Sequence, residues 1–226
     1  MNLLSTKILD QETINLAKSL DFAVDCVDFI EIKKHHFSLP TSSEIDTVLF
    51  TSPNGVESFF QNDEAHIYLK NKFIISIDGK TAKELEMRGI HPAKKGKNGA
   101  EIAQILVASN QYNNILHPCS NIALTEIGDE LKKTDKSYTQ LVVYSTFTRK
   151  EVVDVNKYQA VLFFSPSGVD GYIQSNPLNT NMLYCCIGKT TQEALLQHNN
   201  SIKTVIPEKS SPKEMIIAID QYFKNR

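Results

Sequence analysis

The chain has 226 residues, of which 41% are hydrophobic and 22% charged, a composition that supports a packed core and does not indicate disorder. Its formal net charge of −2 argues against a general binder of nucleic acids or of anionic membranes. No run approaches the roughly 20 apolar residues that span a bilayer. Residues 1–10 hold no apolar segment long enough for a signal peptide, so we expect a cytoplasmic protein.

Apolar periodicity and turn residues predict strands that alternate with helices. The predicted strands are 2–7, 22–32, 47–51, 73–77, 114–117, 138–147, 160–165, 182–187 and 203–206. The predicted helices are 11–20, 53–60, 100–106 and 166–173, with others that end at residues 88, 131, 198 and the C-terminus. We expect the charges of residues 33–36 to end the second strand and residues 94–98 to form a basic loop. This alternation is typical of an α/β fold with largely parallel sheets.

A strand that enters a helix through a Ser-Pro turn occurs twice, as Phe50-Thr51-Ser52-Pro53-Asn54-Gly55-Val56 and as Phe163-Phe164-Ser165-Pro166-Ser167-Gly168-Val169. Two further anchors follow in the same order. Gly79-Lys80-Thr81 matches Gly188-Lys189-Thr190, and Asn98-Gly99-Ala100-Glu101 matches Ser211-Pro212-Lys213-Glu214. A shared order at a nearly constant offset predicts two similar α/β domains.

The two copies are not consecutive, because the units at residues 2–32 and 114–131 each lack a counterpart in the other copy. We therefore predict a discontinuous domain 1 formed by residues 1–33 and 149–226, with residues 37–142 inserted as domain 2. Linker strands at 30–38 and 141–149 would form a two-stranded β-ladder hinge, with the active site in the cleft between the domains.

Each repeated turn lies at the carboxyl end of a strand, where open α/β sheets bind ligands, and begins a helix whose free N–H groups suit anions. Hydroxyl donors are supplied there by Ser52, Thr81, Ser165, Thr190 and Thr191. Serine and threonine in these places also serve as ordinary helix caps. Lysines add cations, although runs of this kind are usually solvated: Lys33, Lys34, Lys94, Lys95 and Lys97.

Strand alternation places Tyr144 on the same face as Val142 and Thr146, opposite Val143 and Ser145. From a linker strand, its hydroxyl would donate a proton in the cleft; the alternative is an amphipathic strand tyrosine whose hydroxyl reaches the surface.

The sequence has no GxGxxG or GxxxxGK[ST] motif, so nucleotide binding has no local support. The four cysteines form no CxxC and are expected to be buried free thiols. The six histidines show no metal-binding spacing. We therefore expect no metal site.

These motifs resemble the uroporphyrinogen-III synthase family. The matching segments are Phe50-Thr51-Ser52-Pro53-Asn54-Gly55-Val56, Phe163-Phe164-Ser165-Pro166-Ser167-Gly168, Ile187-Gly188-Lys189-Thr190-Thr191, Pro118-Cys119-Ser120-Asn121, Val143-Tyr144-Ser145-Thr146 and Ser210-Ser211-Pro212. The resemblance implies a monomeric enzyme that cyclises hydroxymethylbilane to uroporphyrinogen III, with loss of water and inversion of the last pyrrole ring, and without a cofactor. The substrate carries eight carboxylates. The alternative function is a non-catalytic two-domain hinge protein that binds a small polyanionic ligand.

In this family a tyrosine matching Tyr144 is proposed to assist departure of the substrate hydroxyl. The resemblance assigns substrate contacts to Ser52, Thr81, Ser165, Thr190 and Thr191. Further candidates within or beside these motifs are Thr51, Asn54, Asn98, Ser120, Ser167 and Gly168. Lys7 stands where many members carry an arginine; it keeps the charge but not the bidentate geometry. Asp78 is a second departure, because it places a negative charge beside the second turn.

Overall fold

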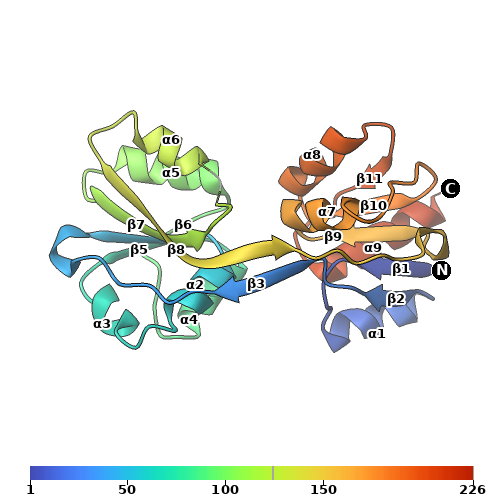
Figure 1. Ribbon diagram of the computed structural model, residues 1–226, viewed down its shortest axis with the longest axis horizontal. Coiled ribbons are helices and arrows are strands. Elements are labelled where there is room, and N and C mark those ends of the chain that lie inside the picture. The colour runs from blue at the N-terminus through green and yellow to red at the C-terminus, as the bar shows by residue number, and fades with distance from the viewer. Residues whose placement is uncertain (124, 226) are drawn as a thin grey trace. The chain divides into compact units, whose positions relative to one another are not determined.

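The structure is a computed structural model that describes residues 1–123 and 125–225 (Figure 1). The chain divides into two compact units. Unit 1 contains Met1–Glu31 and Phe147–Arg226, and unit 2 contains Ile32–Thr146. The chain passes from one unit to the other twice, once within β3 (Ile30–Lys34) and once within β8 (Ser137–Thr148).

Unit 1 is a five-stranded sheet in the order β11-β10-β9-β1-β2, and its neighbouring strands are all parallel. Figure 1 shows the N-terminal strand β1 beside β9, with β2 on the other side of β1, although β1 and β9 lie far apart in the sequence. The strands are β1 (Asn2–Ser5), β2 (Ala23–Cys26), β9 (Ala160–Phe163), β10 (Leu183–Cys186) and β11 (Lys203–Val205). The helices are α1 (Gln11–Ser19), α7 (Pro166–Ile173), α8 (Lys189–His198) and α9 (Pro212–Lys224), with a 3-10 turn at Val155–Lys157.

Unit 2 is a six-stranded sheet in the order β3-β8-β7-β4-β5-β6. Besides β3 and β8, its strands are β4 (Thr47–Phe50), β5 (Phe73–Ile77), β6 (Lys94–Gly96) and β7 (Asn114–Ser120). Its helices are α2 (Pro53–Phe59), α3 (Ala65–Leu69), α4 (Lys80–Glu86), α5 (Gly99–Ala108) and α6 (Glu126–Leu131), with a 3-10 turn at Ser42–Glu44. Sequence reasoning missed the short helix α3.

Both sheets bury both of their faces, which explains why their strands read as continuous apolar runs. In β9, Val161 and Phe163 pack in the core cluster with α7 and α8, whereas Ala160 and Leu162 pack in the cluster with α1 and α9. In unit 2, one cluster joins β4 to α2, α3 and α4, and the other joins it to α5 and α6. The predicted α/β class with two similar parallel-sheet units is confirmed.

The repeat marks equivalent helix starts in the two units. Ser52 caps α2 and Ser165 caps α7. The side chain of each serine accepts a hydrogen bond from the backbone N–H three residues later, at Gly55 and Gly168. Gly79 and Gly188 cap α4 and α8, and Asn98 and Ser211 cap α5 and α9. In unit 1, β1 and β2 occupy the sheet positions that β7 and β8 occupy in unit 2. The N-terminal segment thus completes the sheet of the C-terminal segment.

Three sequence predictions were wrong in detail. The single strand predicted at 22–32 is two strands, because Phe29 between them turns into the core of unit 1. Lys33 and Lys34 lie inside β3, an edge strand whose charged side chains remain in solvent or half-buried. The predicted loop at 94–98 begins as edge strand β6, which pairs with β5.

Candidate functional site

The end of β4 and the start of α2 bring two predicted site residues together. Ser52 has an extended backbone, with φ −145° and ψ 149°, and its Oγ accepts the Gly55 N–H at 2.9 Å. The same Oγ lies 3.0 Å from the Tyr144 hydroxyl, and either oxygen can donate. Gly55 is required for this approach, since a Cβ there would lie 3.0 Å from the Pro118 carbonyl oxygen and 3.1 Å from Ser52 Oγ.

Tyr144 reaches Ser52 because β8 is irregular. Its register against β7 shifts between Cys119 and Ser120, so that Cys119 pairs with Val142 and Ser120 pairs with Tyr144. Val143 and Tyr144 consequently pack in one core cluster, and Tyr144 is only 6% exposed. The predicted simple alternation was wrong here, because a bulge places successive residues on the same side of a strand.

A second hydrogen-bonded group ends on the neighbouring residue, Thr51. Its Oγ1 lies 2.8 Å from Nε2 of His117, and Nδ1 of His117 lies 2.6 Å from the Tyr138 hydroxyl. His117 is 2% exposed, and burial lowers its pKa to about 4, so the ring is neutral at pH 7. Burial raises the pKa of Tyr138 to about 12.

Sequence reasoning missed His117 and Tyr138 as members of the site. The available signal was a histidine inside a buried apolar strand, which needs hydrogen-bond partners. The partners themselves come from two other strands, β4 and β8, so their identity depends on the sheet order.

The other predicted residues of unit 2 divide by exposure. Asn54 is half-buried in the first turn of α2, and Asn98 is exposed, with Oδ1 accepting the Glu101 N–H at 3.0 Å. Ser120 is half-buried, and its Oγ accepts the Ile122 N–H at 3.2 Å. Thr81 is only 3% exposed in α4, so its hydroxyl offers almost no surface to a ligand.

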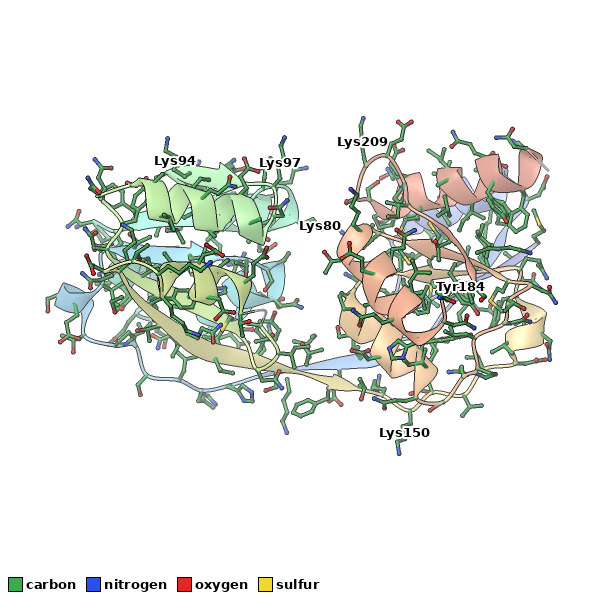
Figure 2. All side chains as sticks on the ribbon, turned by 90° about the horizontal axis from the view of Figure 1, so that it is seen from above. Lys80, Lys94, Lys97, Lys150, Tyr184 and Lys209 are labelled. Carbon is green, nitrogen blue, oxygen red and sulfur yellow. The ribbon has the colours of Figure 1, made fainter. Side chains whose placement is uncertain are left out.

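The predicted lysines of unit 2 differ in their partners. Lys34 pairs with Glu57 at 2.5 Å and Lys95 with Glu86 at 2.6 Å. Lys94 and Lys97 are exposed, and Figure 2 shows their side chains directed away from the ribbon of unit 2. Lys33 is exposed on β3.

In unit 1 the repeated turn holds three of the predicted residues. Ser165 Oγ accepts the Gly168 N–H at 3.1 Å and lies 3.0 Å from Ser167 Oγ. Gly168 is buried, and a Cβ on it would lie 3.6 Å from Oγ1 of Thr6. The Thr6 hydroxyl, a neighbour that sequence reasoning missed, donates to the Leu162 carbonyl at 2.8 Å.

The remaining predicted contacts of unit 1 lie just after β1 and on α8. Lys7 is exposed two residues after the end of β1, and its carbonyl accepts the Ser5 hydroxyl at 2.5 Å. Thr190 is exposed at the start of α8, whereas Thr191 is 3% exposed and packs inward. Burial therefore weakens the case for Thr191 as it does for Thr81.

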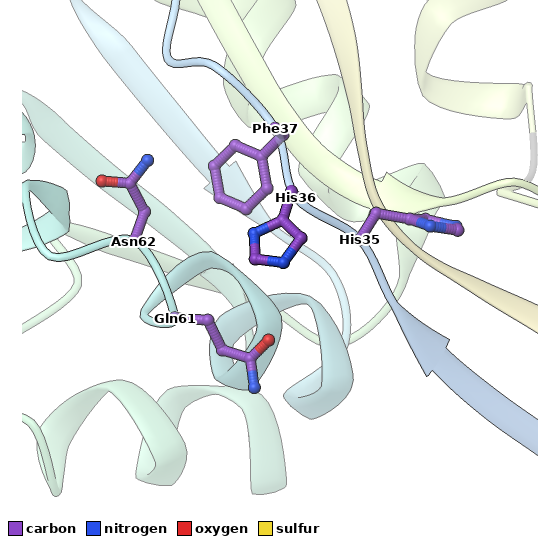
Figure 3. Close-up of a pocket in the computed structure, with 5 residues that line it drawn as sticks. All are labelled: His35, His36, Phe37, Gln61 and Asn62. Atoms are coloured by element: carbon purple, nitrogen blue, oxygen red, sulfur yellow. The ribbon is translucent and has the colours of Figure 1, made fainter.

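A separate pocket of about 400 Å³ lies in unit 2 and contains none of the predicted contacts (Figure 3). It is lined by His35, His36, Phe37, Gln61 and Asn62. In Figure 3 the His36 ring faces Gln61, while the His35 ring points away from both. Nε2 of His35 lies 2.6 Å from Ser145 Oγ.

The described residues include no group of three or more His, Cys, Asp or Glu side chains that could hold a metal ion. The four cysteines are free, but Cys26 is half-buried rather than buried as expected. Burial raises the pKa of Cys119 to about 11 and that of Cys186 to about 12, so these thiols are neutral and poor nucleophiles.

Comparisons with known proteins add a family and a fold. The family model described as "Uroporphyrinogen-III synthase HemD" matches residues 11–217. A mutant uroporphyrinogen III synthase of Thermus thermophilus has a TM-score of 0.73 at 15% identity, covering 100% of both chains. The uroporphyrinogen-III synthetase of Helicobacter pylori has a TM-score of 0.69 at 16% identity, covering 100% of this chain and 99% of that one. At these identities the two structures show the fold alone. No curated protein sequence matches the chain.

Proposed function

We propose a mechanism from one premise: the chain belongs to the uroporphyrinogen-III synthase family. It is accordingly a lyase of haem biosynthesis that acts on a tetrapyrrole. The proposed reaction cyclises the linear substrate hydroxymethylbilane to uroporphyrinogen III, with loss of water and inversion of the last ring. Among the described residues no helix is long and apolar enough to cross a membrane. A monomer in the cytoplasm, without a nucleic-acid partner, remains the expectation from the sequence.

The observation that carries the mechanism is the 3.0 Å contact between Ser52 Oγ and the Tyr144 hydroxyl. Ser52 Oγ already accepts the Gly55 N–H, so the serine proton is free to point at the Tyr144 oxygen. Ser52 then does not need the phenolic proton, which in the proposed mechanism goes to a substrate oxygen. The serine proton and the start of α2 would also stabilise negative charge that develops on the phenol as its proton leaves.

In the proposed step Tyr144 donates its proton to the hydroxyl of hydroxymethylbilane, the C–O bond breaks and water departs. The electron-rich pyrrole nitrogen stabilises the carbocation that remains. The substituted carbon of the last ring then attacks the cation and forms a spiro intermediate, whose rearrangement inverts that ring. Loss of a proton restores the aromatic pyrrole, and the Tyr144 phenolate regains a proton.

Substrate binding would rest on hydroxyl, amide and amine donors at the carboxyl ends of the strands. Those exposed or half-buried are the proposed contacts for carboxylates: Lys7, Thr51, Ser52, Asn54, Asn98, Ser120, Ser165, Ser167 and Thr190. The backbone N–H of Gly168 serves the cap of α7, so this glycine would shape the turn rather than bind substrate. The cleft between the two units stays a prediction.

The test is turnover of hydroxymethylbilane with identification of the product isomer. We expect wild-type protein to form uroporphyrinogen III. Tyr144→Phe should lower turnover at least tenfold, a change of about 1.4 kcal/mol in the barrier, while the circular dichroism spectrum stays unchanged. Tyr112→Phe is the matched control, since Tyr112 is also buried in unit 2 but belongs to the other core cluster. Formation of only the non-enzymatic type I isomer at every protein concentration would refute the function. Near-normal turnover of Tyr144→Phe would remove Tyr144 as the proton donor.

A further inference from the structure

A line of hydrogen bonds through the buried His117 leads from β8 across β7 to the Thr51 hydroxyl, just after β4. Tyr138 on β8 lies 2.6 Å from His117 Nδ1 on β7, and His117 Nε2 lies 2.8 Å from Thr51 Oγ1 at the end of β4. Thr51 precedes Ser52, the residue that contacts Tyr144. Two separate hydrogen-bonded groups therefore end on adjacent residues.

The direction of these bonds follows from what each group has to satisfy. A neutral imidazole has one N–H donor and one acceptor nitrogen. His117 Nδ1 lies 2.6 Å from the Tyr138 oxygen, within reach of the phenolic proton. Leaving that half-buried proton without an acceptor would be costly. Donation from Tyr138 to Nδ1 satisfies that proton inside the protein, and it makes Nε2–H the donor to Thr51 Oγ1.

The result is a threonine whose oxygen is already occupied as an acceptor. Its own proton has no further acceptor among the described residues, and the half-buried side chain is partly open to ligands. If the hydrogen bonds ran in the opposite direction, the Thr51 hydroxyl would donate its proton to His117 Nε2 and would present a lone pair to the ligand. A lone pair repels a carboxylate, whereas an O–H binds it.

The internal repeat supplies a comparison within the same chain. The residue that precedes the Ser-Pro turn is Thr51 in unit 2 and Phe164 in unit 1. Both turns nevertheless form the same serine cap and helix start. The turn thus folds without a threonine at this position and without a buried histidine behind it. A structural requirement of the turn does not explain the Tyr138–His117–Thr51 line.

We propose that Tyr138 and His117 are positioning residues that hold Thr51 as a hydrogen-bond donor to a carboxylate of the substrate. The inference rests on the proposed function for the identity of the ligand. The direction of the hydrogen bonds rests on the two contacts of the buried imidazole and does not depend on the identity of the ligand. Thr51 is the group in contact with substrate, and the other two act through it.

The direction is tested in the wild-type protein by long-range ¹H–¹⁵N correlation spectra of ¹⁵N-labelled histidine side chains at pH 7. We expect the His117 proton on Nε2 and none on Nδ1. A proton on Nδ1 would overturn the proposal whatever the enzyme's activity. This measurement requires no variant and no substrate.

The role is tested by a double-mutant cycle read as KM and kcat for hydroxymethylbilane. Thr51→Val and Tyr138→Phe should each raise KM about tenfold with kcat nearly unchanged, as expected for a lost bond to a charged group. Thr51→Ser keeps the hydroxyl and should restore KM to within about threefold. The double variant should be no worse than Thr51→Val alone, because Tyr138 acts through Thr51.

If the double variant raises KM near a hundredfold, the product of the two single effects, then Tyr138 acts only on structure, and the proposal is overturned. Tyr112→Phe is the control for loss of a buried phenol in the same unit, and its KM should equal that of wild type. If Tyr138→Phe fails to fold, the Thr51 pair and the tautomer decide the question. A wild-type protein that makes only the type I isomer refutes the proposed function instead, an outcome separate from the tautomer measurement.

Discussion

Acidification should destabilise unit 2 through a single buried histidine. His117 is 2% exposed, and burial lowers its pKa from 6.5 to about 4. In the unfolded chain it takes up a proton near pH 6.5, whereas in the folded chain it stays neutral until about pH 4. Stability is therefore fully present above pH 6.5 and falls as the pH drops through this window.

The size of the effect follows from the shift. A difference of about 2.5 pH units, at 1.36 kcal/mol for each unit, corresponds to about 3 kcal/mol of unfolding free energy. That is a large part of the stability of a domain of this size, which is typically about 5–15 kcal/mol. Protonation would also turn both ring nitrogens into donors, so Tyr138 could no longer donate to Nδ1.

The assay must report on unit 2 by itself, because the chain forms two compact units. Hydrogen exchange of β7 peptides, followed by mass spectrometry between pH 7 and pH 4.5, provides this reading once the intrinsic exchange rates are corrected. His117→Gln should lose most of the slope in this range, whatever its stability at pH 7. His91→Gln, which changes an exposed histidine, should keep it. Equal slopes in wild type and His117→Gln would refute the reasoning.

Two further predictions concern backbone and cap. Gly171→Ala should destabilise unit 1 by about 3 kcal/mol, because the added Cβ would lie 2.2 Å from the Phe29 carbonyl oxygen. Gly188→Ala is the control, since the nearest atom to its added Cβ lies at 3.8 Å. Urea unfolding should show a cost of less than about 1 kcal/mol for this variant. Ser52→Ala should cost about 1 kcal/mol and lower turnover about tenfold. Ser211→Ala removes a similar cap from α9 at a similar cost without changing turnover; equal turnover in both would contradict the role of Ser52.

Much of the fold was predictable because its signals are local. A Ser-Pro pair after an apolar run determines a strand end, a cap and a helix start within a few residues, and both predicted turns have that geometry. The matching anchors also predicted two similar units. The division of residues 22–32 into two strands was not predictable in this way. Apolar alternation continues through Phe29, and only the packing of that ring in unit 1 interrupts the strand.

The candidate site was predictable in its residues but not in its contacts. Ser52 and Tyr144 were both predicted as site residues, yet their 3.0 Å contact depends on a bulge in β8 that no turn residue in the sequence indicates. Thr81 and Thr191 were expected to contact substrate because they lie at helix starts, but each occupies a position of its helix that faces the core. Their burial is a property of helix orientation, which the local sequence leaves open.

The asymmetry between the two repeated turns indicates where the chemistry belongs. In unit 2 the turn is joined to a tyrosine through Ser52 and to a neutral histidine through Thr51. In unit 1 the equivalent positions are Ser165, whose side-chain partner is Ser167, and Phe164. Both turns have hydroxyls and helix N–H groups that suit an anion, but among the described residues the phenol contacts the unit 2 turn. Under the proposed mechanism proton transfer takes place at the end of β4, and the equivalent turn of unit 1 would serve binding.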